Sequence, residues 1–127
     1  MRILLDTHIA LWAVTAHPKM PARATELILA AESVYVSAAS IWEISIKHNL
    51  KPKQIGMTGQ DALSEFTSAG FTLLAISPEH AAAVGSLTAH HQDPFDRILI
   101  AQAIQEPMRL LTCDKQLATY SELVQLV

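Results

Sequence analysis

Four acidic residues lie beside strongly apolar sequence, an unusual setting for ionised groups. Asp6 follows Ile-Leu-Leu, Glu43 lies within Ser-Ile-Trp-Glu-Ile-Ser-Ile, and Asp96 precedes Arg-Ile-Leu-Ile-Ala. Asp114 follows Leu-Leu-Thr-Cys. A carboxylate in apolar surroundings is costly unless it is paired or bound to a metal ion, and converging carboxylates repel one another. A divalent cation would remove both penalties.

The type of these side chains indicates which cation and which reaction. Carboxylate oxygens favour Mg²⁺ or Mn²⁺ over zinc. Cys113 is the only cysteine, and the adjacent His90 and His91 point in different directions, so no zinc site is expected. A bound divalent cation orients a water molecule, lowers its pKa and stabilises charge on a phosphate. The four acids therefore predict phosphodiester hydrolysis by in-line attack of water.

Each acid also has a simpler structural explanation, which remains open at this point. Asp6 can cap a following helix, and Glu43 can pair with Lys47 four residues later. Asp96 falls at the third position of a predicted helix, where it complements the helix dipole. Asp114 can cap a turn. The argument for a site is therefore that all four fall at one predicted edge.

That edge follows from the order of the predicted elements. Short apolar segments alternate with helical ones, which predicts an α/β fold with a central, mostly parallel sheet of four to five strands and helices on both faces. Asp93 is the predicted cap of the helix that starts at Pro94. The predicted strands are 2–5, 34–36, 71–76, 109–112 and 123–127. The predicted helices are 8–16, 21–31, from Ser37 or Ser40 to about 49, 60–69, from 77, 93–107 and 115–119, with a loop over 51–59. Sites in such folds gather beyond the carboxyl ends of the strands.

Length and composition set limits on the class of protein. The 127 residues, half of them hydrophobic, suit one domain over 1–127. The formal net charge of −3 argues against binding nucleic acid by charge alone. An acid interrupts the first apolar run, and no apolar stretch approaches the roughly 18 residues of a membrane span. The chain is therefore expected to be cytoplasmic.

Other residues have weaker indications. Thr7 and Thr112 are candidates to support the acids through their hydroxyls, and Arg97 is a candidate phosphate contact. Three lysines, Lys47, Lys51 and Lys53, either face nucleic acid or are simply solvated. The large aromatic residues and the cysteine are expected to pack in the core, namely Trp12, Trp42, Phe95 and Cys113.

Four segments together resemble the PIN-domain family, and within it the VapC-type toxins of bacterial toxin–antitoxin pairs. They are Ile-Leu-Leu-Asp-Thr-His-Ile-Ala-Leu-Trp at 3–12, Val-Ser-Ala-Ala-Ser-Ile-Trp-Glu-Ile-Ser-Ile-Lys at 36–47, His-His-Gln-Asp-Pro-Phe-Asp-Arg-Ile-Leu-Ile-Ala-Gln-Ala at 90–103, and Leu-Leu-Thr-Cys-Asp at 110–114. They span nearly the whole chain in the family's order.

The resemblance implies a PIN fold and a Mg²⁺- or Mn²⁺-dependent endoribonuclease in which a metal-activated water attacks RNA. Asp6, Glu43, Asp96 and Asp114 match the family's acids and would be both the catalytic and the metal-binding residues. By the same resemblance, Asp93 would be a secondary contributor to the site. The resemblance also implies a cognate antitoxin as partner and a homodimer. Two alternatives stay open: a catalytically silent PIN-like module that binds RNA or protein, and a DNA nuclease or generic phosphatase.

Overall fold

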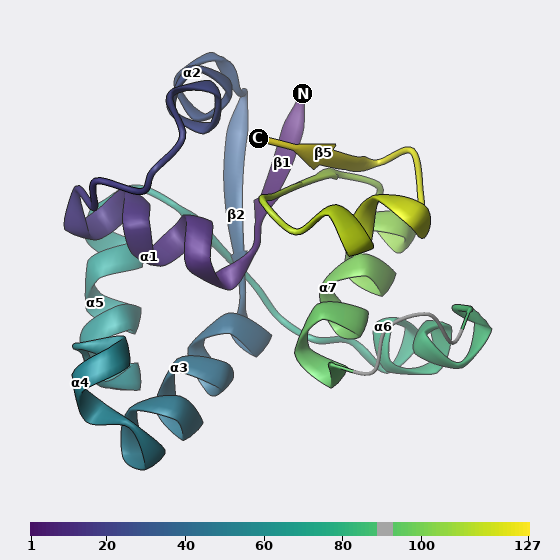
Figure 1. The fold of residues 1–127 in the computed structure, drawn as a ribbon. Coiled ribbons are helices and arrows are strands. Elements are labelled where there is room, and N and C mark those ends of the chain that lie inside the picture. Colours follow the sequence, from purple (N-terminus) through teal and green to yellow (C-terminus); the bar gives the residue numbers. More distant parts are fainter. Residues whose placement is uncertain (89–92) are drawn as a thin grey trace.

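The computed structural model describes residues 1–88 and 93–127, and its centre is a five-stranded sheet (Figure 1). The central strand β1 (Arg2–Leu5) has β2 (Ser33–Ser37) and β3 (Thr72–Leu74) on one side. On the other side lie β4 (Arg109–Thr112) and β5 (Val124–Leu126). Every neighbouring pair is parallel. The predicted fold class is therefore confirmed, and the described sheet is parallel throughout.

Helices connect the strands, and their bounds agree with the predicted ones within two residues wherever a helix was predicted to start and end. They are α1 (Thr7–Thr15), α2 (Ala22–Ala30), α3 (Ala38–Leu50), α4 (Pro52–Ile55), α5 (Gly59–Ser68), α6 (Pro78–Ala83) and α7 (Pro94–Gln105), with 3-10 turns η1 (Val84–Ser86) and η2 (Lys115–Thr119). In the described parts of the chain, no helix has the length and apolar character needed to cross a bilayer.

The sheet is covered on both faces by separate hydrophobic clusters. Successive strand residues point to opposite faces, so Ile3 and Leu5 pack with Phe66 of α5 and with residues of α1 and α2. Leu4 points the other way and packs with Leu99 of α7. Figure 1 shows α1 and α5 on one side of β1 and β2, and α6 and α7 on the other. These layers hold the carboxyl ends of the strands at a common edge.

Two sequence-based expectations about this scaffold were wrong. The segment 51–59 was expected to be a loop, but it contains α4. Pro52 occupies the first helical position, where its missing N–H costs nothing, and Gly56 at φ 74° ends the helix. His90 and His91, considered above as zinc ligands, lie outside the described residues.

The other wrong expectation concerns residues assigned to the core. Trp42 is 57% exposed. Glu43 and Ile44 lie on the buried side of α3, so Trp42, which precedes them, lies on the outer side of the helix. The Trp42 ring packs edge-on against Phe95 of α7, with ring centroids 5.1 Å apart. Cys113 is exposed as well.

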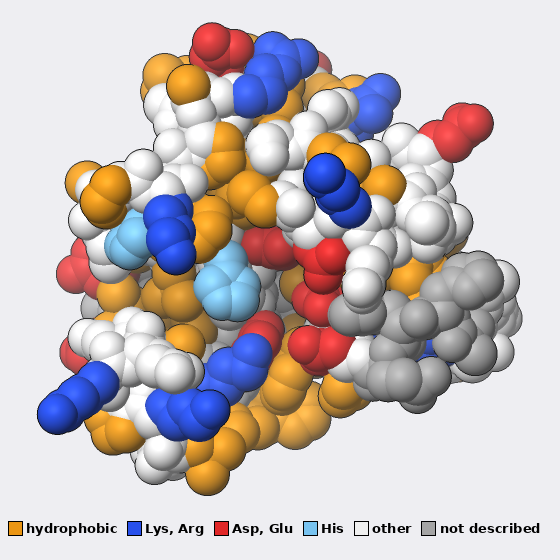
Figure 2. Space-filling view, in the orientation of Figure 1, with side chains coloured by type: hydrophobic (Ala, Val, Ile, Leu, Met, Phe, Trp, Pro, Cys, Tyr) orange, Lys and Arg blue, Asp and Glu red, His pale blue; other side chains and the backbone are white. Residues whose placement is uncertain are grey.

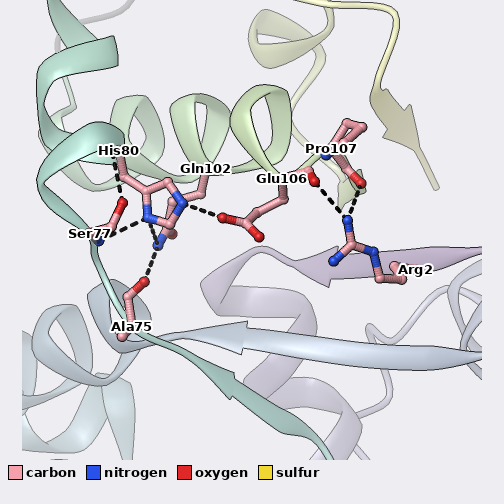
Figure 3. A network of polar contacts seen from close by, with 7 residues as sticks. All are labelled: Arg2, Ala75, Ser77, His80, Gln102, Glu106 and Pro107. Atoms are coloured by element: carbon pink, nitrogen blue, oxygen red, sulfur yellow. Dashed lines mark hydrogen bonds and ion pairs between the residues drawn. The ribbon is translucent and has the colours of Figure 1, made fainter.

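A polar network joins α6, α7 and β1 near the C-terminal end of α7 (Figure 3). His80 is buried, and its Nε2 lies 2.5 Å from Glu106 Oε2. Its Nδ1 lies 3.3 Å from the amide nitrogen of Gln102. Arg2 donates a hydrogen bond of 2.8 Å to the carbonyl oxygen of Glu106. The network anchors one end of α7, and the opposite end carries Asp96.

Candidate active site

Asp6 occupies the turn between β1 and α1. Its backbone N–H donates to the carbonyl oxygen of Leu111 at 3.0 Å, which holds the turn beside the end of β4. Its Oδ1 accepts from the N–H of Ile9 at 3.0 Å and thereby caps α1. Its Oδ2 accepts from the Thr112 hydroxyl at 2.5 Å. Asp6 is thus a helix cap and also a buried carboxylate, 7% exposed.

Burial makes the ionised form of Asp6 unfavourable. Desolvation raises the pKa of Asp6 above its ordinary 3.8, although the hydrogen bonds from Thr112 and Ile9 oppose that shift. The charge of His8 also lowers the pKa, whereas the charge of Glu43 raises it. A cation at this carboxylate would therefore stabilise its ionised form.

Glu43 projects from α3 toward the same place and is 4% exposed. Its Oε1 accepts from the hydroxyl of Thr7 at 2.6 Å. The Thr7 Oγ1 also lies 2.9 Å from Ser40 Oγ. Because Thr7 directly follows Asp6, this contact draws the two buried carboxylates together. Glu43 Oε2 lies 2.5 Å from Lys47 Nζ, so the ion pair considered from the sequence is present too.

Lys47 lies close enough to the acids at the start of α7 to be affected by their charge. Partial burial lowers the pKa of Lys47, but the hydrogen bond to Glu43 and the charge of Glu43 outweigh it, so the pKa is raised. The charges of Asp93 and Asp96 raise it further. Both acids therefore act on the ammonium group that contacts Glu43. Asp93 also caps α7, its Oδ1 accepting from the N–H of Phe95 at 2.9 Å.

Asp114 follows β4 and shares a cavity with Asp6. The cavity measures about 310 Å³, and His8, Trp12 and Cys113 also line it. One Asp114 oxygen accepts from a backbone N–H at 2.9 Å and so caps η2. Figure 2 shows Asp and Glu side chains gathered around a hollow near the centre of this face, with a histidine and Lys or Arg side chains beside it.

The residues fit a Mg²⁺-type ion by the kind of donor they offer. In residues 1–88 and 93–127, no three His, Cys, Asp or Glu side chains stand together as a ready set of metal ligands. Mg²⁺ needs no such cage, because it is usually held by one or two carboxylates together with water and substrate phosphate. Asp6 and Glu43 meet that requirement. In the structure, the Lys47 ammonium is the cation beside Glu43.

The supporting residues divide into two groups. Thr7 and Thr112 donate to the two buried carboxylates, as expected of supporting hydroxyls. Arg97 instead donates to the carbonyl oxygens of Thr88 and Val84, at 2.7 and 3.2 Å, which ties η1 to α7. Sequence reasoning did not nominate His8, although its place two residues after Asp6, in the first turn of α1, was a usable signal.

The order of the strands explains why the site forms where it does. From β1, the chain adds β2 and β3 on one side and then β4 and β5 on the other. The order in which successive strands are added to the sheet therefore reverses between β1 and β4. Ligands of open α/β sheets bind outside the carboxyl ends of the strands at this reversal. Asp6 follows β1 and Asp114 follows β4, so both stand at it.

Comparison with known proteins identifies a family whose model matches this chain. The family model described as PIN domain matches residues 3–123. Ribonuclease VapC22 of Mycobacterium tuberculosis is 29% identical over 119 residues, covering 93% of this chain and 91% of that protein.

Two solved structures are also similar in fold. VapBC2 from Rickettsia felis, bound to a DNA fragment from its promoter, has a TM-score of 0.72 at 21% identity, covering 98% of this chain and 96% of the other. VapC20 of Mycobacterium tuberculosis, described as a sarcin-ricin loop cleaving toxin, has a TM-score of 0.60 at 14% identity, covering 94% and 97%.

Proposed function

The chain belongs to the PIN domain family, and from that premise we propose that it is a Mg²⁺- or Mn²⁺-dependent endoribonuclease, the toxin of a toxin–antitoxin pair. The relative at 29% identity is named a ribonuclease, and VapC20 is described as a sarcin-ricin loop cleaving toxin. The proposal includes an antitoxin protein as partner and a homodimer, both of which follow from the family resemblance.

One observation carries the catalytic part of the proposal. Asp6 and Glu43 come from different parts of the chain, yet both are buried, and the hydroxyl of Thr7, the residue after Asp6, donates to Glu43 at 2.6 Å. Two neighbouring buried carboxylates are costly, and the Lys47 ammonium offsets the charge of only one of them, Glu43. Such a pair is the arrangement expected of groups that share a divalent cation.

The chain's own residues have distinct tasks in this proposal. Asp6 and Glu43 would hold the cation, and Asp114 and Asp96 would complete or tune the site. When bound, the cation would supply Lewis-acid activation of water and neutralise charge on the phosphate. Thr112 donates to Asp6 and Thr7 donates to Glu43, and these bonds orient the two carboxylates. The cavity between Asp6 and Asp114 opens this place to a substrate.

The test replaces one carboxylate without changing its size. In Asp6→Asn the amide oxygen can still accept from the N–H of Ile9, and the amide NH2 can donate to the Thr112 hydroxyl, but the charge is gone. We expect cleavage of RNA by EDTA-treated, Mg²⁺-replenished protein to fall by on the order of 100-fold or more. Glu65→Gln, an exposed carboxylate-to-amide change on α5, is the matched control and should cleave like wild type.

A second measurement does not depend on turnover. A ligand at about 100 times its Kd stabilises the folded state by about 2.7 kcal/mol, so Mn²⁺ should raise the Tm of wild type and of Glu65→Gln. It should leave Asp6→Asn nearly unchanged. Full activity of Asp6→Asn, or equal metal stabilisation of all three proteins, would refute the proposal. Parallel assays on single-stranded DNA and a small phosphate ester separate a DNA nuclease or phosphatase from a ribonuclease.

A further inference from the structure

A second cavity lies beside the carboxylate cavity, at the junction of α3 and α4. It measures about 400 Å³. Its lining comprises His8, Lys47, Leu50, Lys51, Gln54 and Ile55. Among the described residues, no Asp or Glu side chain lines it. Its polar side-chain groups are therefore the ammonium groups of two lysines, the imidazole of His8 and the amide of Gln54.

This cavity concentrates positive charge in a chain whose net charge is negative. Three of the nine lysines and arginines lie within residues 47–53, and two of them, Lys47 and Lys51, line the cavity. Several of the others are engaged elsewhere. Arg2 donates to main-chain carbonyl oxygens, and Arg23 pairs with Glu26 at 3.4 Å. The local charge at the α3–α4 junction thus differs in sign from that of the adjacent acidic site.

Two residues of the basic cavity adjoin the acidic site. His8 lines both cavities. Lys47 lines the basic cavity while its Nζ contacts Glu43, a member of the acidic site. A chain molecule lying across the carboxylates would therefore pass over His8 and meet the ammonium groups next.

Two backbone hydrogen bonds hold the main chain of Lys51 at this point. Lys51 is the residue between α3 and α4, and its N–H donates to the Lys47 carbonyl oxygen at 2.7 Å. Its own carbonyl oxygen accepts from the Gln54 N–H at 3.1 Å. Its side chain is exposed and lines the cavity. A fixed backbone with an exposed ammonium group suits a residue that binds a phosphate as a point charge.

We propose that this cavity is a subsite for a backbone phosphate of the RNA, next to the phosphate held at the carboxylates. Lys51 is the main contact to that phosphate. Lys47 and His8 form the boundary of the subsite toward the acidic site. The proposal rests on the proposed ribonuclease function. It explains how a protein of net charge −3 can hold a polyanion: local cations bind the flanking phosphates. Contacts to phosphate position the strand without reading its sequence.

The test uses Lys51→Gln with Lys53→Gln as matched control, because Lys53 is exposed nearby but does not line the cavity. Lys47 is unsuitable because it also contacts Glu43. Each change is made in the Asp6→Asn background. Fluorescence anisotropy then measures binding of a labelled single-stranded RNA of about 12 nucleotides in the presence of Mg²⁺, while the salt concentration is varied from about 50 to about 200 mM.

Each phosphate contact contributes about 0.7 to the slope of log affinity against log salt for single strands. We therefore expect Lys51→Gln to reduce the slope by about 0.7 and to weaken binding several-fold, equally for RNAs of different sequence. Lys51→Arg should retain the slope, and Lys53→Gln should resemble the Asp6→Asn parent. In the active background, Lys51→Gln should raise KM and leave kcat within about twofold.

The possible failures are distinguishable. If wild type cleaves RNA but Lys51→Gln and Lys53→Gln have the same slope and the same KM, the subsite is refuted and the ribonuclease proposal stands. A loss that depends on RNA sequence would also refute it, because it would indicate a base contact. If wild type neither cleaves nor binds RNA, both proposals fail together.

Discussion

Thr112→Val removes one hydroxyl from the candidate active site and leaves the shape of the side chain nearly unchanged. Thr112 is fully buried at the end of β4. Its hydroxyl donates to Asp6 Oδ2 at 2.5 Å and accepts from the N–H of Asp114 at 3.0 Å. Valine keeps the β-branch that suits a strand, so the pairing of β4 with β1 should persist.

The expected cost comes mainly from the bond to Asp6. A hydrogen bond to a charged group contributes about 1.5–3 kcal/mol to stability. The N–H of Asp114 is only partly buried, so water can replace its lost acceptor at little cost. We therefore expect Thr112→Val to lower the free energy of unfolding by about 2–3 kcal/mol at neutral pH.

The pH dependence has a definite sign. Burial already raises the pKa of Asp6, and the Thr112 bond opposes that shift, so removing the bond raises the pKa further. A carboxyl whose folded pKa lies above its unfolded pKa binds more protons in the folded state. Its contribution to stability is then fully present below the unfolded pKa and is lost as pH rises through the folded pKa. In EDTA, the loss should extend to higher pH in Thr112→Val than in wild type.

Urea unfolding in EDTA from about pH 4 to about pH 8 measures both effects. Thr112→Ser is the control, because it keeps the hydroxyl and loses only a methyl group worth about 0.8 kcal/mol. The reasoning is wrong if Thr112→Val is as stable as Thr112→Ser at neutral pH, or if the three pH profiles run parallel.

Two further predictions concern the scaffold. Phe66 is fully buried, so Phe66→Ala should lower the free energy of unfolding by about 3–5 kcal/mol in urea unfolding. Leu63→Ala, at a 38% exposed position of the same helix, should lower it far less. Comparable losses would contradict the packing described. A Cβ added at Gly59 would lie 1.8 Å from Ser45 Oγ, so Gly59→Ala should destabilise by about 1–3 kcal/mol. Adding Ser45→Ala should recover part of that loss, and strictly additive effects would contradict the contact.

Local signals predicted most of the secondary structure, because the interactions involved lie within a few residues. Ser77 caps α6 through the His80 N–H, and Asp93 caps α7 with Pro94 next to it. The short helix α4 was missed, since four residues carry too little periodicity to indicate a helix. Trp42 was misplaced because its hydrophobicity does not reveal which side of α3 faces the core.

The amino-acid sequence alone determined most of the element types, the parallel sheet and the set of acids near its carboxyl edge. Local backbone preference, hydrophobic alternation and capping act over short distances and can be read directly. Only the tertiary structure decided the strand order, because any parallel strands joined by helices can pair in several orders. That order puts Asp6 and Asp114 on either side of the reversal, while the packing of α3 brings Glu43 to Thr7 and Lys47 to the boundary of the basic cavity.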